Sequence, residues 1–163
     1  MQDLDPGASG LTPGRCIHFR VARVLFPAAA AIVRRVTLDH AVRHPHGVYI
    51  DAPHRLAFIA GEESATIGVL DLTTFALRQV LRVGSDPDVL AFDLALARLY
   101  VAAESGVVAV FEEREGSLEQ LGWYRAPWAH SVAVDPGTHQ VYLSLANVGG
   151  HPVLRVLAPS DHE

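Results

Sequence analysis

The chain has 163 residues, half of them hydrophobic, and a formal net charge of −5 in which all 13 basic residues are arginine. This length suits one domain with a substantial core. The charge gives no basic patch of the kind that binds nucleic acid, and no apolar run is long enough to cross a membrane as a helix. The single cysteine, Cys16, excludes a disulfide within the chain.

Residues 1–38 precede the regular part of the sequence. Residues 1–19 start with acidic, glycine- and proline-containing sequence, and we expect a disordered leader there. Residues 20–38 contain alternating apolar and arginine positions, which predict strands with one solvent-exposed face. The apolar run Val24–Val33 shows no clear signal peptide, because Asp3 and Asp5 precede it and no clean cleavage site follows. The compartment therefore stays open between cytoplasmic and secreted or periplasmic.

One short stretch organises the rest of the chain, because it occurs three times. The stretch Val48–Asp51 returns as Leu90–Asp93 and as Val132–Asp135, so that the three closing aspartates are evenly spaced along the chain. Two further apolar runs follow each copy at similar distances. The second runs are 56–59, 99–102 and 141–144, and the third runs are 67–70, 107–110 and 153–156.

A period of about 42 residues, with short apolar runs between turns, is typical of the four-stranded blade of a β-propeller. The sequence therefore predicts an all-β fold, a propeller fragment or half-propeller with about three four-stranded blades. The blades span about 42–83, 84–125 and 126–163 within the repeat region 39–163. The third repeat reaches its third strand at Val153–Leu157 but shows no outer strand, and residues 20–38 read as the outer strands of an incomplete blade.

Two structural expectations follow from this architecture. The inner strands should be sandwiched between blades, so their apolar side chains should be almost fully buried. These side chains are Val48, Ile50, Leu90, Phe92, Val132 and Val134. Three blades do not close a ring, since propellers have at least four. Either the chain is a piece of a larger propeller, or two copies form a six-bladed ring in which Ile32–Leu38 of one copy lies beside Val153–Leu157 of the other.

The repeats resemble the bacterial YVTN-repeat β-propellers from about Arg43 to Pro159. The resemblance rests on Asp86–Asp93, on Arg98–Ala103 and on Ser131–Pro136, and the naming motif is half kept in Tyr100-Val101 and Tyr142-Leu143. This resemblance implies a scaffold that binds a small molecule or a protein, because the family has no single activity.

Candidate ligand-binding residues lie just before the inner strands. Five positions before each repeat aspartate stand His46, Asp88 and His130, which open the innermost strand at the channel rim. Two imidazoles and a carboxylate can hold a divalent metal ion or act in acid–base chemistry. Further rim candidates precede them: Arg43, His44, Asp86 and Trp128.

Two interpretations of these residues stay open. In the first, the rim belongs to a binding module without a cofactor, and polar residues there cap turns, as Asp51, Asp93 and Asp135 are expected to do. In the second, His46, Asp88 and His130 hold a divalent metal in a lactonase-like hydrolase or lyase at the channel mouth. The sequence has no nucleophile elbow, phosphate loop or paired-cysteine zinc motif.

Overall fold

The computed structural model describes residues 32–158, except for the side chains of Asp39 and His130. The expected leader at residues 1–19 lies outside this range, as do residues 20–31. The elements of the described range are η1 (Asp39–Ala41), β1 (Pro45–Asp51), β2 (Leu56–Gly61), β3 (Thr66–Asp71), β4 (Leu77–Arg82), β5 (Pro87–Asp93), β6 (Arg98–Ala103), β7 (Val107–Arg114), β8 (Ser117–Arg125), β9 (Ala129–Val134), β10 (Val141–Val148) and β11 (His151–Leu157).

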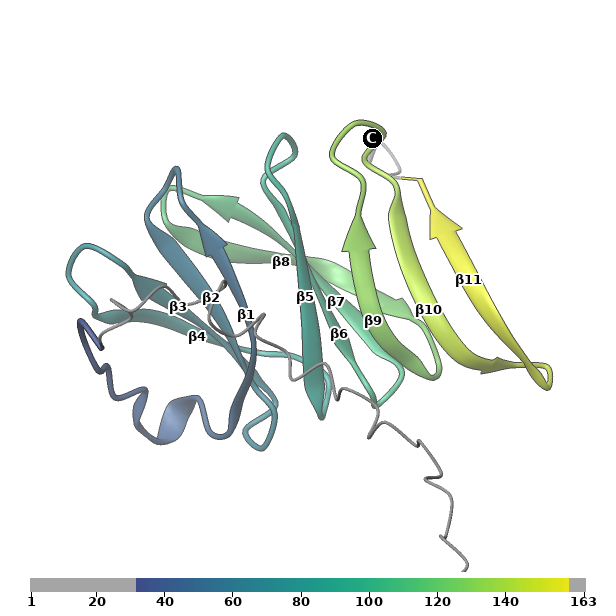
Figure 1. The fold of residues 1–163 in the computed structure, drawn as a ribbon, viewed down its shortest axis with the longest axis horizontal. Coiled ribbons are helices and arrows are strands. Elements are labelled where there is room, and N and C mark those ends of the chain that lie inside the picture. The colour runs from purple at the N-terminus through teal and green to yellow at the C-terminus, as the bar shows by residue number, and fades with distance from the viewer. Residues whose placement is uncertain (1–31, 159–163) are drawn as a thin grey trace, which may run out of the picture. The chain divides into compact units, whose positions relative to one another are not determined.

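These strands form three antiparallel sheets that repeat along the chain (Figure 1). Sheet 1 has the order β1–β4, sheet 2 has the order β5–β8, and sheet 3 contains β9, β10 and β11. The first strand of each sheet is innermost, so that β1, β5 and β9 lie side by side. The predicted all-β, partial-propeller fold is thus confirmed. Among the described residues, none belongs to a helix long and apolar enough to span a bilayer.

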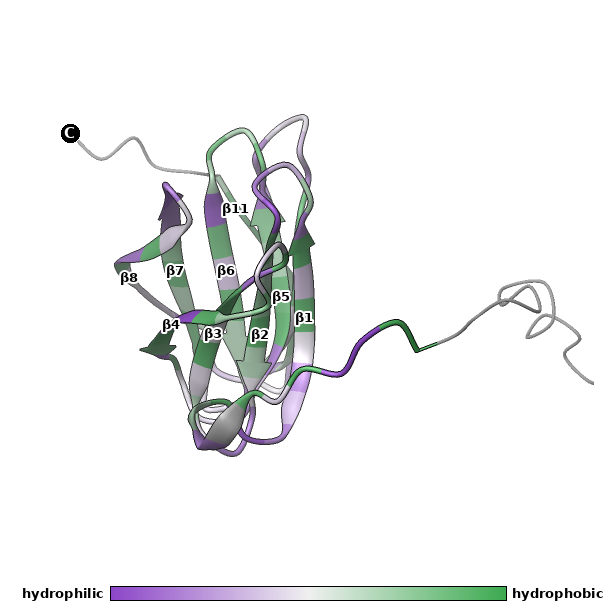
Figure 2. Ribbon diagram, turned by 90° about the vertical axis from the view of Figure 1, so that its left-hand side faces the viewer, coloured by the Kyte–Doolittle hydropathy of each residue, from purple (hydrophilic) through white to green (hydrophobic). Residues whose placement is uncertain are grey.

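The hydrophobic core lies at the two junctions between neighbouring sheets. At the first junction, the ring of Phe92 on β5 packs between Tyr49 and Phe58 of sheet 1, with centroids 5.4 Å from each. At the second junction, Leu143 and Val141 of β10 are buried against sheet 2. Figure 2 shows how widely hydrophobic residues are distributed along the strands. This distribution follows from the architecture, because a sheet between two others must be apolar on both faces.

The expected burial of the inner strands is only partly found. Phe92 and Val132 are buried, and Leu90 and Val134 are partly exposed. The prediction is wrong for Val48 and Ile50, whose exposed fractions are 63% and 50%. Both lie on β1, at the end of the stack, where no neighbouring sheet covers the strand within the described chain. At the opposite end, Leu154 and Val156 of β11 are likewise exposed.

The segment before β1 does not form the strand expected over Ile32–Leu38. Residues 32–38 have no regular secondary structure, and η1 follows them. The part of the segment nearest η1 nevertheless packs where a neighbouring blade would lie. Val36, Leu38 and the buried Val42 contact a cluster on the outer face of sheet 1, the face turned away from sheet 2.

Replacement of Phe92 by alanine tests the first junction. We expect Phe92→Ala to lower the free energy of unfolding by roughly 3–5 kcal/mol, because it leaves a cavity between two sheets. Urea denaturation of both proteins measures the change. The control is Leu94→Ala in the exposed turn after β5, which should change stability by no more than about 0.5 kcal/mol. A loss below about 1 kcal/mol for Phe92→Ala would show that the junction is not packed as described.

Candidate functional site

The loop before each inner strand has the same strained backbone conformation. His44, Asp86 and Trp128 occupy one equivalent position in successive repeats, and their φ angles are 49°, 56° and 64°. Non-glycine residues seldom adopt this left-handed conformation, which is sterically unfavourable. Its recurrence at one repeat position shows that the three loops, here called the rim loops, are built alike.

A hydrogen bond to the adjacent hairpin closes each rim loop. The carbonyl oxygens of His44, Asp86 and Trp128 accept from the backbone N–H of Glu62, Glu104 and Ala146, at 3.1, 3.0 and 3.2 Å. Each donor lies at the end of the second strand of the same sheet or just after it, where the hairpin to the third strand begins. The rim loops and these hairpins consequently share one edge of the three sheets.

The side chains at this position differ from one sheet to the next. The His44 side chain is 70% exposed, and its Nδ1 lies 2.7 Å from a carboxylate oxygen of Glu62. Asp86 is exposed, and Trp128 is 62% exposed. Arg43 lies against the hairpin, where its guanidinium donates to the carbonyl of Glu63 at 3.1 Å. The rim loops thus present an imidazole, a carboxylate and an indole in equivalent backbone frames.

Two of the three expected metal ligands lie together at the first junction. The Nδ1 of His46, at the start of β1, is 2.5 Å from Oδ1 of Asp88 on β5. The close approach depends on Gly47, because a Cβ there would collide with the carbonyl oxygen of Asp88. The third expected ligand, His130, lies near the start of β9 at the second junction, but its side chain is outside the described part of the structure.

The His46–Asp88 pair has two chemical uses. An imidazole and a carboxylate are both divalent-metal ligands, and a third ligand would complete a site that is open to substrate. Without a metal, the Asp88 carboxylate can orient the His46 ring for acid–base chemistry. Either use requires further groups from the rim, since this pair alone supplies only two ligand atoms.

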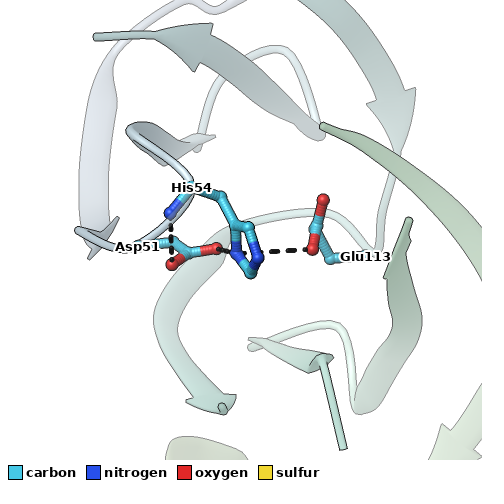
Figure 3. Close-up of side chains that lie close together, drawn as sticks. All are labelled: Asp51, His54 and Glu113. Atoms are coloured by element: carbon cyan, nitrogen blue, oxygen red, sulfur yellow. Dashed lines mark hydrogen bonds and ion pairs between the residues drawn. The ribbon is translucent and has the colours of Figure 1, made fainter. Parts of the chain in front are cut away.

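Sequence reasoning missed a second cluster, which also crosses the first junction (Figure 3). It contains Asp51 at the end of β1, His54 in the following turn, and Glu113 on β7 of sheet 2. The His54 Nδ1 lies 2.7 Å from Asp51 and 3.6 Å from Glu113, and both carboxylates are buried. His54 has no counterpart at the same position of the other repeats, so the period gave no signal for it.

Both carboxylates of this cluster also accept hydrogen bonds that stabilise turns. Asp51 accepts from the backbone N–H of His54, and Glu113 accepts from that of Gly116 at 2.6 Å. The equivalent Asp93 accepts from two turn amides, and its other oxygen lies 2.7 Å from the ring of His139 across the second junction. The expected turn role of the repeat aspartates is therefore confirmed, and a histidine lies against one at each junction.

Asp135, the third repeat aspartate, shows the electrostatic effect of such a turn. The Thr138 hydroxyl and the Gly137 amide donate to its carboxylate and lower its pKa. The pKa of His54 is shifted in the opposite direction. The hydrogen bond to Asp51, and then the charges of Asp51 and Glu113, raise the pKa of the imidazole.

The raised pKa of His54 predicts how stability changes with pH. A histidine whose pKa is higher in the folded state stabilises the fold below its unfolded pKa of about 6.5, and that contribution is lost as pH rises through the folded value. The difference in unfolding free energy between wild type and His54→Gln should therefore be larger at about pH 5.5 than at about pH 8.5.

Urea denaturation at both pH values measures this difference. The matched control is His40→Gln, which replaces another exposed histidine. Equal pH dependence in His54→Gln and the control would contradict the coupling between His54 and the two carboxylates.

No protein-family model and no curated protein matches the sequence. Solved structures, however, share its fold. A putative 6-phosphogluconolactonase from Bacteroides uniformis aligns with a TM-score of 0.61 and 18% identity, over 83% of this chain and 44% of that one. The Cps50 (Swd1) β-propeller domain of Myceliophthora thermophila aligns with a TM-score of 0.55 and 19% identity, over 68% and 35% of the two chains.

The WD40 repeats of RRP9 align with a TM-score of 0.60 and 17% identity, over 77% of this chain and 41% of theirs. This chain thus spans less than half the length of each of these structures. At such identities the likeness establishes the fold alone. The three sheets are those of a partial β-propeller.

Proposed function

We propose that this chain is a binding module of YVTN-repeat type that captures a protein or peptide ligand at its rim. The rim residues are Arg43, His44, His46, Asp86, Asp88, Trp128 and His130. The observation that carries the proposal is that rim loops of one backbone conformation present an exposed imidazole at His44 and an exposed indole at Trp128. A common backbone frame thus presents different side chains at equivalent positions, as a surface that recognises a varied ligand requires.

The exposure of the rim favours a protein or peptide over an enclosed small molecule. The His44 and Trp128 side chains are largely in solvent. Small-molecule sites usually bury most of the ligand in a concave pocket, whereas protein interfaces use exposed aromatic and charged side chains. Tryptophan is also enriched among the residues that contribute most to protein binding.

Association of two copies would complete the rim. Three sheets leave apolar side chains uncovered at both ends, on β1 at Val48 and Ile50 and on β11 at Leu154 and Val156. Exposed apolar faces of this kind mark interfaces, and twofold pairs are the commonest oligomers. Two copies would supply six blades, and both sets of rim residues would then surround one channel.

A photo-crosslinking amino acid at position 128 tests the rim in an extract of the source cells. We expect defined protein adducts from position 128, because Trp128 is exposed beside the bound ligand in this proposal. The matched control carries the same amino acid at Leu94. This residue is 52% exposed in the turn after β5, at the end of the strand that is opposite the rim. Addition of His44→Ala should reduce adduct formation. Equal labelling from positions 128 and 94, or none from 128, would overturn the rim as the binding surface.

A metal-assisted hydrolase or lyase is the second candidate function. The contact between His46 and Asp88 favours it, since two metal-binding groups meet at the channel mouth. A similar solved structure bears the description putative 6-phosphogluconolactonase, which is a statement about that protein. In this chain His46, Asp88 and His130 would hold the divalent ion, whose role would be to polarise a substrate carbonyl and lower the pKa of a water.

Calorimetric titration of the purified chain with Zn²⁺ tests this candidate. We expect saturable binding that His46→Ala abolishes and His54→Ala retains, because the second histidine belongs to the other carboxylate cluster. Loss of binding only in His54→Ala would instead assign the metal site to the cluster that contains Asp51 and Glu113. Absence of saturable binding to the wild type would remove the metal-assisted mechanism.

A further inference from the structure

The cluster of Asp51, His54 and Glu113 joins sheet 1 to sheet 2 at the edge opposite the rim (Figure 3). Asp51 ends β1 and His54 lies in the turn that follows, whereas Glu113 belongs to β7 of the neighbouring sheet. One donor atom of each side chain lies within 4.8 Å of the donor atoms of the other two. Carboxylates and imidazole are ordinary ligands of divalent metal ions, so three such ligands surround one point.

Both carboxylates of the cluster are removed from water. The side chain of Asp51 is fully buried and that of Glu113 is 4% exposed, whereas that of His54 is 53% exposed. Burial of an ionised carboxylate is costly unless an opposite charge compensates it. The imidazole supplies one positive charge at most, and only when it is protonated. Two ionised carboxylates therefore leave the cluster with a net negative charge.

No arginine of the described residues compensates this charge. Arg78 lies beside Gly116, in the turn that follows β7, but its guanidinium pairs with Asp71 at 2.9 Å. Within the described part of the chain, the ion pairs of Asp51 and Glu113 are those with His54 alone.

The two carboxylates also have fewer hydrogen-bond donors than the corresponding group at the second junction. There, Oδ1 of the buried Asp93 accepts from two turn amides, at 3.0 and 3.1 Å. Oδ1 of Asp51 accepts from one amide, that of His54, at 3.4 Å. In Glu113, Oε1 accepts from a turn amide, but Oε2 lies 3.6 Å from the His54 ring, beyond hydrogen-bond distance. A cation between these oxygens would supply the interaction that they lack.

Close packing of the first junction holds the two carboxylates near each other. On β4 the Gln79 side chain donates to the carbonyl of Leu118 at 3.0 Å and accepts from its N–H at 2.8 Å, which ties sheet 1 to β8 of sheet 2. The second junction is less completely filled, since a mostly apolar cavity of about 390 Å³ lies beside Gly122 between sheets 2 and 3. Ligands carried by packed strands are preorganised, so less freedom is lost when an ion binds them.

We propose that Asp51, His54 and Glu113 form a divalent-cation site that links sheet 1 to sheet 2. Carboxylate-rich sites suit hard ions such as Mn²⁺, whereas the expected rim set of two imidazoles and one carboxylate is closer to a zinc site. The ion replaces the proton that His54 Nδ1 donates to Asp51, and water completes its coordination on the exposed side of the imidazole. Because the ligands come from two sheets, binding stabilises the junction. The proposal does not depend on ligand capture at the rim.

The distances within the cluster suit such an ion after small movements. Ligand atoms bound to one ion at about 2.2 Å lie about 3 Å apart when they are adjacent. The His54 Nδ1 is now 2.7 Å from the Asp51 carboxylate and 3.6 Å from that of Glu113. The half-exposed imidazole can make this adjustment, because it is the one ligand that is not enclosed by the two sheets.

Mn²⁺ binding to the chelator-treated protein tests the site, measured by electron paramagnetic resonance of the unbound ion. We expect one Mn²⁺ per chain. Glu113→Gln should weaken binding by at least about tenfold, because it removes a charged ligand but keeps an oxygen for the turn amide. The matched control is Glu115→Gln, an exposed residue of the same turn, which should bind as the wild type does. His46→Ala should also bind normally.

Three results would overturn the proposal. They are the absence of saturable binding to the wild type, equal affinity in Glu113→Gln and the wild type, and loss of binding in His46→Ala, which would assign the ion to the rim. Urea denaturation of Glu113→Gln without added Mn²⁺ shows whether this variant is folded. If it is not, His54→Gln takes its place, with His40→Gln as its control and the same expected result.

Thermal unfolding tests whether the bound ion links the two sheets. Mn²⁺ at about 100 times its Kd should raise the unfolding midpoint of the wild type and of Glu115→Gln by at least about 5 °C. In Glu113→Gln the increase at the same Mn²⁺ concentration should be smaller than about 1 °C. An equal increase in Glu113→Gln and the wild type, or binding that leaves the midpoint of the wild type unchanged, would contradict a site between the sheets.

Discussion

Every sheet in this fold is apolar on both faces, and each therefore needs a covering layer on both sides. Sheet 2 meets this requirement, since the cluster around Phe92 lies on one face and the cluster around Leu143 on the other. Within the described residues, the outer face of sheet 1 is covered only in part, by the segment around Val42, and the outer face of sheet 3 is exposed at Leu154 and Val156. Leaving apolar area in water costs about 25 cal/mol per Å², so any surface that covered these side chains would stabilise the fold.

The rim depends on the same packing. His46 and Asp88 belong to different sheets, and they meet only because β1 and β5 pack side by side. The carboxylates of Asp51 and Asp93 sit at the opposite ends of these strands, where His54 and His139 lie against them. Polar contacts thus border the apolar junctions at both edges. A ligand that binds the rim would contact two sheets at once and would be sensitive to how they are stacked.

The repeat period was sufficient to predict the sheets, the turn aspartates and the common position of His44, Asp86 and Trp128. These features occur in every repeat, so the interpretation of one repeat can be tested against the other two. Burial at the ends could not be predicted in this way. Val48 has the same pattern as Leu90, but whether a sheet lies against it depends on what flanks the repeats in space.

Contacts between residues at different repeat positions could not be predicted from the sequence pattern either. His54 lies near Glu113 because the turn after β1 faces β7 of the next sheet, and no spacing along the chain indicates that distance. The cavity beside Gly122 was similarly hidden, since a glycine in a strand does not reveal whether the space above it is filled. Such features require the stacking of the sheets to be known.

Gly47 has a consequence for how the rim tolerates change elsewhere. Because a Cβ at Gly47 would collide with the Asp88 carbonyl oxygen and with the Leu90 side chain, β1 and β5 approach each other too closely there for any larger residue. A substitution at Gly47 would therefore push the two strands apart and move His46 away from Asp88, although neither of those side chains is changed. The geometry of the rim depends in this way on a residue that contributes no side chain to it.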